Sequence, residues 1–125
     1  GGGAGAAGNQ SNPPGTVPYS SPEPVASSSG GIGKAYTIAD GTTSVYYAGG
    51  GGGSLMSAQS TPYMGQGGQG GGGQGGNESA TNPPGRPSSG QAGTANRGGG
   101  GGSPAQQTAS PIVGGGKGVV IVRWT

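Results

Sequence analysis

The chain has 125 residues, of which 36 are glycine and 11 are proline, and its formal net charge is +2. It contains no Cys, no His and no Phe. This composition excludes disulfides, cysteine-ligated metals and an ordinary hydrophobic core, because so few large apolar side chains cannot offset the entropy lost on ordering the chain. The five basic residues are scattered, so no nucleic-acid surface is predicted, and no segment has the length and hydrophobicity for membrane insertion.

Glycine clusters recur along the chain, and we expect them to form its scaffold. They occupy residues 1–8, 49–53, 65–76, 98–102 and 114–116. Extended glycine can form the left-handed polyproline II helix, whose N–H and C=O groups must be satisfied by neighbouring segments. Such packing leaves no room for a Cβ, which is the structural role expected of Gly51 and Gly100. A flexible linker is the alternative interpretation of the same runs.

The remaining elements are extended, and no helix is predicted because no apolar period of 3.6 residues occurs. Residues 36–47 predict a β-hairpin turning at Asp40 and Gly41, either through a two-residue type I′ turn or through a longer loop. Residues 119–122 are a short apolar run, which indicates a strand buried on both faces or an edge strand docked on a partner. Residues 119–124 are expected to pair with another segment, for which this hairpin is the favoured candidate. Trp124 is expected to cover the glycine layers.

The fold class expected is therefore irregular and glycine-rich: packed polyglycine-II or polyproline-II helices, a short β-hairpin, a C-terminal strand and essentially no α-helix. Residues 1–125 are expected to be a single glycine-rich domain, a fragment or the C-terminal part of a longer chain. The Gln side chains that interrupt the third cluster are expected on an outer face; they are Gln66, Gln69 and Gln74.

Catalytic patterns are absent from the sequence. Gly3, Gly5 and Gly8 satisfy GxGxxG, but no predicted strand precedes them and no helix follows, as a dinucleotide site requires. The acidic residues are Glu23, Asp40 and Glu78. A carboxylate pair could hydrolyse glycosides, but the turn already explains Asp40. We therefore expect no enzyme activity and no cofactor.

Aromatic and basic residues in the stretches between glycine clusters are the candidate contact surface. Aromatic side chains in loops provide contact area at a low entropic cost. The five candidate binding residues are Tyr19, Tyr63, Met64, Arg86 and Arg97.

Three phrases carry a resemblance to a known family: SVYYAGGGGG at residues 44–53, ANRGGGGG at 95–102 and GGGKGVVIVRW at 114–124. In this order they resemble the glycine-rich domain of bacteriophage tail-fibre adhesins and related phage and bacterial surface proteins. The resemblance covers residues 45–124 approximately. It implies a sandwich of packed polyglycine-II helices in a virion or extracellular protein, with loops at one end that carry host recognition.

The partners implied by the resemblance are a host receptor, either a polysaccharide or an outer-membrane protein, and other virion proteins or identical subunits. The stretches between the glycine runs are rich in proline, and the middle glycine cluster is interrupted by Gln. These departures leave open a purely structural module of a phage fibre, a capsid or a bacterial surface filament. Ice binding by a flat glycine face is a weaker alternative, because the stretches between the runs are irregular.

Overall fold

A computed structural model describes residues 1–9, 28–54, 65–76, 90–104 and 113–124 of the chain. Within these residues there is no helix, and the regular secondary structure is one small antiparallel sheet. Its strands are β1 (Lys34–Tyr36) and β2 (Val45–Tyr47). The expectation of an irregular, non-helical fold with a short hairpin is thus confirmed.

The hairpin turns through a long loop rather than a two-residue turn. Lys34 pairs with Tyr47, Ala35 with Tyr46 and Tyr36 with Val45, so residues 37–44 form the connection. The Gly41 amide donates to the Thr37 carbonyl, and Gly41 has a φ of 84°, a conformation that favours glycine. The Asp-Gly pair therefore lies at the reversal of the chain, as predicted.

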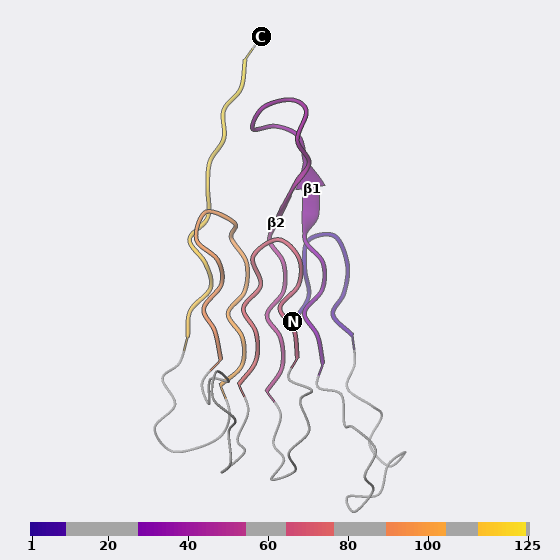
Figure 1. The fold of residues 1–125 in the computed structure, drawn as a ribbon, viewed down its shortest axis with the longest axis vertical. Coiled ribbons are helices and arrows are strands. Elements are labelled where there is room, and N and C mark those ends of the chain that lie inside the picture. The colour runs from indigo at the N-terminus through magenta and orange to yellow at the C-terminus, as the bar shows by residue number, and fades with distance from the viewer. Residues whose placement is uncertain (10–27, 55–64, 77–89, 105–112, 125) are drawn as a thin grey trace, which may run out of the picture.

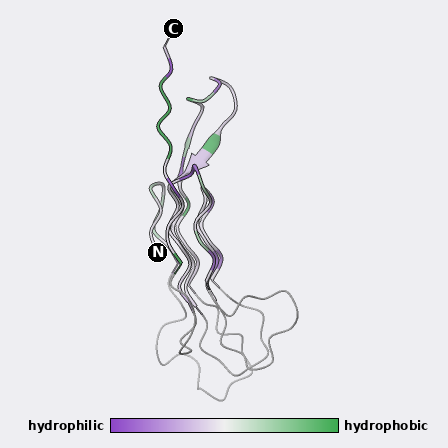
Figure 2. Cartoon of the chain, turned by 90° about the vertical axis from the view of Figure 1, so that its left-hand side faces the viewer, coloured by the Kyte–Doolittle hydropathy of each residue, from purple (hydrophilic) through white to green (hydrophobic). Residues whose placement is uncertain are grey.

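The rest of the described chain runs back and forth in a layered array, visible in Figure 1 and from the side in Figure 2. We call this array the glycine block; it comprises residues 1–9, 28–33, 48–54, 65–76, 90–104 and 113–118. Every residue that is buried in the described part of the chain is a glycine. No large side chain there is fully buried. The interior of the block is therefore made of main chain.

Backbone hydrogen bonds join the segments of the block, and they recur with a period of three residues. The donor-to-acceptor pairs along residues 49–53 are Gly50 to Gly31 and Gly53 to Ser28; Gly49 to Gly70 and Gly52 to Gly73; Gly100 to Gly49 and Ser103 to Gly52; Gly68 to Gly50 and Gly65 to Gly53. Residues 49–53 thus form a hydrogen bond with each neighbouring segment once every three residues. A β-ladder would instead alternate with a period of two.

The same period appears away from this central run. Gly30 and Gly33 donate to Gln66 and Gln69, and the side chains of these two Gln residues are exposed as expected, whereas Gln74 is half-buried. Residues that carry side chains thus lie where the segment faces away from its neighbours.

Two tight turns reverse the chain between neighbouring segments of the block. Gly70 and Gly71 have φ values of 106° and 94°, and Asn96 and Gly98 have φ values of 61° and 63°. Gly and Asn are the residues that adopt this left-handed region at least cost. The phrase ANRG is therefore a turn signal, and the glycine cluster that follows it is the next segment of the block.

Residues 119–124, here called the terminal segment, do not form the strand expected of them. The one sheet in the described residues contains β1 and β2, and none of the backbone hydrogen bonds there involves the terminal segment. The hairpin's strands are three residues long and pair with each other, and the terminal segment rises beside the hairpin without entering the ladder (Figure 1). The prediction that it pairs with the hairpin is wrong.

Candidate functional site

The glycine block has two chemically different ends. The four stretches outside the described residues are 10–27, 55–64, 77–89 and 105–112. The described residues that flank them lie together at the end of the block away from the hairpin (Figure 1). We call this the insert end and the opposite one the hairpin end.

Hydrogen bonds hold these flanking residues beside one another. The Asn9 amide donates to the Ser29 carbonyl at 3.1 Å, and the Gly53 amide donates to Ser28 at 2.8 Å. The Gly76 amide donates to Ser103 at 2.9 Å. The chain therefore enters and leaves the four stretches at residues that are far apart in the sequence but are joined by hydrogen bonds at one end of the block.

Four of the five predicted contact residues lie outside the described residues: Tyr19, Tyr63, Met64 and Arg86. The fifth, Arg97, lies at the hairpin end in the turn that contains Asn96. Its guanidinium donates to the Tyr46 carbonyl at 2.9 Å and lies 5.6 Å from the centre of the Tyr47 ring. Arg97 is half-buried and joins this turn to β2, rather than being a free contact residue.

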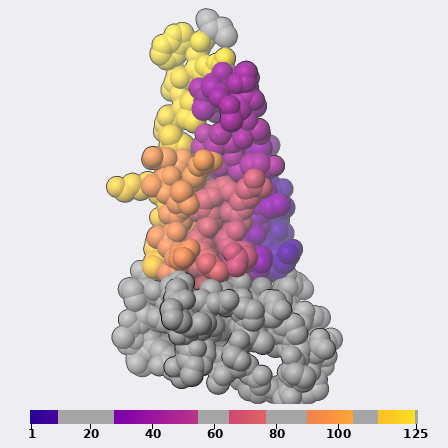
Figure 3. Space-filling model, in the orientation of Figure 1, coloured from indigo at the N-terminus to yellow at the C-terminus, as the bar shows by residue number. Residues whose placement is uncertain are grey.

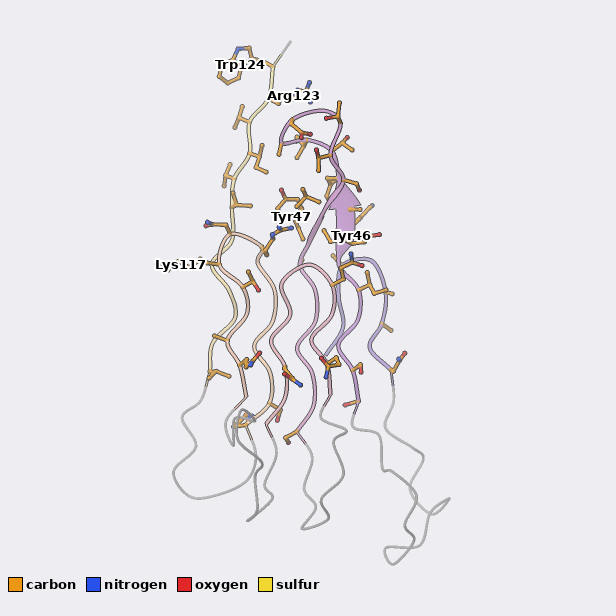
Figure 4. All side chains as sticks on the ribbon, viewed as in Figure 1. Tyr46, Tyr47, Lys117, Arg123 and Trp124 are labelled. Atoms are coloured by element: carbon orange, nitrogen blue, oxygen red, sulfur yellow. The ribbon has the colours of Figure 1, made fainter. Side chains whose placement is uncertain are left out.

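The hairpin end contains every charged and every aromatic residue of the described part of the chain. These residues are Lys34, Tyr36, Asp40, Tyr46, Tyr47, Arg97, Lys117, Arg123 and Trp124. Figure 4 shows Lys117 pointing away from the block, and Arg123 and Trp124 near the tip. The Lys34 ammonium lies 5.7 Å from the centre of the Tyr36 ring. Apart from Arg97 and Lys117 at this end, the described residues of the block present only backbone and uncharged side chains.

Asp40 is held in its ionised form by the hairpin loop. The backbone amides of Thr42 and Thr43 donate to its Oδ1 at 2.9 and 2.7 Å. The Thr43 hydroxyl, together with these amides, lowers the pKa of Asp40 from 3.8 to about 2. These are the hydrogen bonds of an Asx turn, so the role of the carboxylate is to stabilise the hairpin loop.

The structural residues predicted from the sequence have different surroundings. Gly51 is buried, and a Cβ added there would overlap the Gly101 carbonyl oxygen. Gly100 is exposed, and the nearest atom to an added Cβ would be the Gly51 nitrogen at 3.0 Å. Trp124 is 83% exposed at the tip of the molecule, so it does not cover the glycine layers as expected.

The described residues hold little that could do chemistry. They include a single carboxylate, Asp40, and no group of three His, Cys, Asp or Glu that could hold a metal. Nor does this part of the chain contain a helix with the length and hydrophobicity of a membrane span. Comparison of the chain with protein-family models, with curated proteins and with solved structures gave no match.

Sequence reasoning missed the gathering of charge at the hairpin end, although a signal existed. Lys117 directly follows a glycine cluster, Arg97 directly precedes one, and Lys34 follows the glycine-rich stretch at residues 30–33. Because the clusters run the length of the block, residues at their borders fall at its ends. Charged residues at the borders of glycine clusters thus indicate which residues lie together at one end of the block.

Proposed function

We propose that this chain is a non-enzymatic receptor-binding domain of a phage tail fibre or related virion appendage. Packed polyglycine-II helices would form its scaffold, and the stretches between the glycine runs would contact the host surface. The observation that carries the proposal is the three-residue period of the backbone hydrogen bonds. It supports the scaffold of packed polyglycine-II helices that the resemblance implies.

The period matches the geometry of a threefold helix. A polyproline-II helix has three residues per turn and no internal hydrogen bonds, so residues three apart face the same neighbour. Gly50 and Gly53 both donate to residues 28–33, and Gly49 and Gly52 both donate to residues 70–73. Burial of glycine alone favours the same assignment, since a Cβ would fill the space between adjacent backbones.

The arrangement of the ends favours recognition at the insert end. Binding residues commonly lie on connecting segments that a rigid scaffold positions. All four intervening stretches are attached at one end of the block, and they carry Tyr19, Tyr63, Met64 and Arg86. The partner would be a polysaccharide or an outer-membrane protein of the host, met outside the cell by the virion.

The test is binding of the fluorescently labelled full chain to a panel of bacterial strains. We expect the double variant Tyr63→Ser, Met64→Ser to lose about tenfold or more in affinity for a strain that the parent binds, as loss of an aromatic anchor does. Tyr36→Ser is the matched control, because Tyr36 is 46% exposed at the hairpin end. Both variants should keep the parent's melting temperature.

Two results would overturn the adhesin proposal. One is binding of the double variant that equals the parent's, and the other is failure of the parent to bind any strain of the panel. Either result would favour the second candidate, a purely structural module that contacts only its neighbours in a fibre. The observation in favour of this second candidate is the exposed apolar terminal segment.

A further inference from the structure

The terminal segment is an extended stretch that the described part of its own chain leaves uncovered. Val120, Val122 and Trp124 are 90%, 72% and 83% exposed. Figure 2 shows this part of the chain coloured hydrophobic and standing apart from the block, and Figure 3 shows it with the hairpin as the narrow end of the molecule. Apolar side chains exposed together in this way mark a surface that meets another protein.

The two faces of the terminal segment differ. Side chains alternate in an extended chain, so Val119, Ile121 and Arg123 share one face, and Val120, Val122 and Trp124 share the other. The first face is turned toward the molecule: Val119 is 45% exposed, Ile121 is half-buried, and the Arg123 guanidinium lies against Gly41. The second face is an apolar stripe with no partner among the described residues.

The backbone of the terminal segment likewise has no hydrogen-bond partner among the described residues. Its N–H and C=O groups make no hydrogen bond with the described residues, whereas the block and the hairpin bond their backbones to each other. An unpaired β-prone segment is a template for strand addition from another chain. Val and Ile are the residues that suit such pairing best.

We propose that the terminal segments of two copies of this chain pair antiparallel, with Val122 opposite Val122 of the partner and Val120 opposite Trp124 of the partner. This proposal does not depend on host binding. Each copy brings the same free edge and the same apolar stripe, so one twofold contact satisfies both. The register places an aromatic ring opposite a β-branched side chain, which is a favourable cross-strand pair.

Charge disfavours the parallel alternative. Parallel pairing in register would place Arg123 beside Arg123 of the next copy, and like charges directly opposite are destabilising. In the antiparallel register Arg123 faces Ile121 of the partner. The two guanidinium groups are then about 7 Å apart along the strands, at about 3.4 Å per residue.

The area available fits a weak dimer. A tryptophan side chain buries on the order of 150–250 Å², and a valine worth about 2 kcal/mol at about 25 cal/mol per Å² buries about 80 Å². Edge-to-edge pairing leaves the outer face of these side chains open to water, so two copies remove less than about 1,000 Å², below the range of stable specific interfaces. The dimer should therefore be weak, and its population should rise with the concentration of the chain.

Disulfide trapping tests both the contact and its register, because the parent chain has no cysteine. Val122→Cys places two sulfurs opposite each other on the twofold axis, at a separation that a disulfide can bridge. We expect it to form cross-linked dimers about tenfold or more faster than Ile32→Cys, because pairing raises the effective concentration. Ile32 is a matched control, since it is 48% exposed and lies in the glycine block.

Val120→Cys tests the register, because its own copy in the partner lies too far away for a disulfide. It should cross-link no faster than Ile32→Cys. Sedimentation gives an independent measurement: Val120→Lys, Val122→Lys should be monomeric at concentrations where Ile32→Lys still dimerises. The proposal is overturned if Val122→Cys cross-links no faster than Ile32→Cys, or if Val120→Cys cross-links as fast as Val122→Cys.

Discussion

At the scale of single residues, the position of each glycine decides what a methyl group would cost. Gly51 and Gly100 stand in similar runs, and the same structural role is expected of both from their positions in the sequence. We expect Gly51→Ala to destabilise the fold by about 3 kcal/mol or more, because the added Cβ would overlap the Gly101 carbonyl. Gly100→Ala should cost less than about 1 kcal/mol, since its neighbour needs to move only slightly and alanine also orders the unfolded chain.

Chemical denaturation of the two variants measures this difference. Gly2→Ala is the control, because an added Cβ there has no atom within 4 Å. Equal stability of the Gly51 and Gly100 variants would contradict the close approach of residues 51 and 101. It would also remove the main support for packed glycine helices.

Asp40 makes the stability of the hairpin loop depend on pH. Its pKa in the folded chain is about 2, below the ordinary value of 3.8, so its hydrogen bonds stabilise the loop fully above pH 3.8. That contribution is lost as the pH falls through the folded value. We expect the amide NMR signals of Thr42 and Thr43 to shift together with a midpoint near pH 2, and Asp40→Asn to abolish the shift. A midpoint close to 3.8 would contradict the Asx turn.

At the scale of elements, the sequence predicted what depends on local chemistry. Asp40 and Gly41 mark the hairpin, because one carboxylate and one left-handed glycine specify a reversal without reference to the rest of the chain. The sequence allows either a two-residue turn or a longer loop, and the eight residues between β1 and β2 show the longer connection.

The arrangement of the glycine runs could not be predicted in the same way. A run of identical residues without side chains carries no pattern that selects one neighbour or register over another. The structure places residues 49–53 between residues 28–33, 65–73 and 99–104. That choice depends on where the turns at Gly70 and Asn96 reverse the chain, which is the sequence information that glycine itself lacks.

The terminal segment shows where a sequence pattern misleads. Residues 119–122 resemble a buried strand because all four are Val or Ile, yet Val120 is 90% exposed. The apolar run predicts burial against the hairpin, and the structure contradicts that prediction. A second copy of the same segment would cover the apolar run without any change in the hairpin.

At the scale of the whole molecule, the glycine scaffold lies between two ends that carry the charged, aromatic and candidate contact residues. The hairpin end carries the charged and aromatic side chains of the described residues, including Arg97 and Lys117 of the block, and the insert end is where the candidate contact stretches attach. Sequence reasoning placed Arg97 with the loop contacts, although its bond to Tyr46 makes it part of the hairpin end. The other four candidates were chosen by residue type, since no pattern in the sequence fixes how the stretches fold.

A core made of main chain should leave a calorimetric signature in the whole molecule. Ordinary domains unfold with a heat-capacity change of about 12–15 cal/mol/K per residue, because exposing apolar surface raises the heat capacity and exposing polar surface lowers it. Here the buried described residues are all glycine, so unfolding exposes mainly peptide groups. We expect scanning calorimetry of the full chain to give less than about half the ordinary value per residue. An ordinary value would mean that apolar side chains, and not hydrogen-bonded backbone, supply the cooperative interior of this fold.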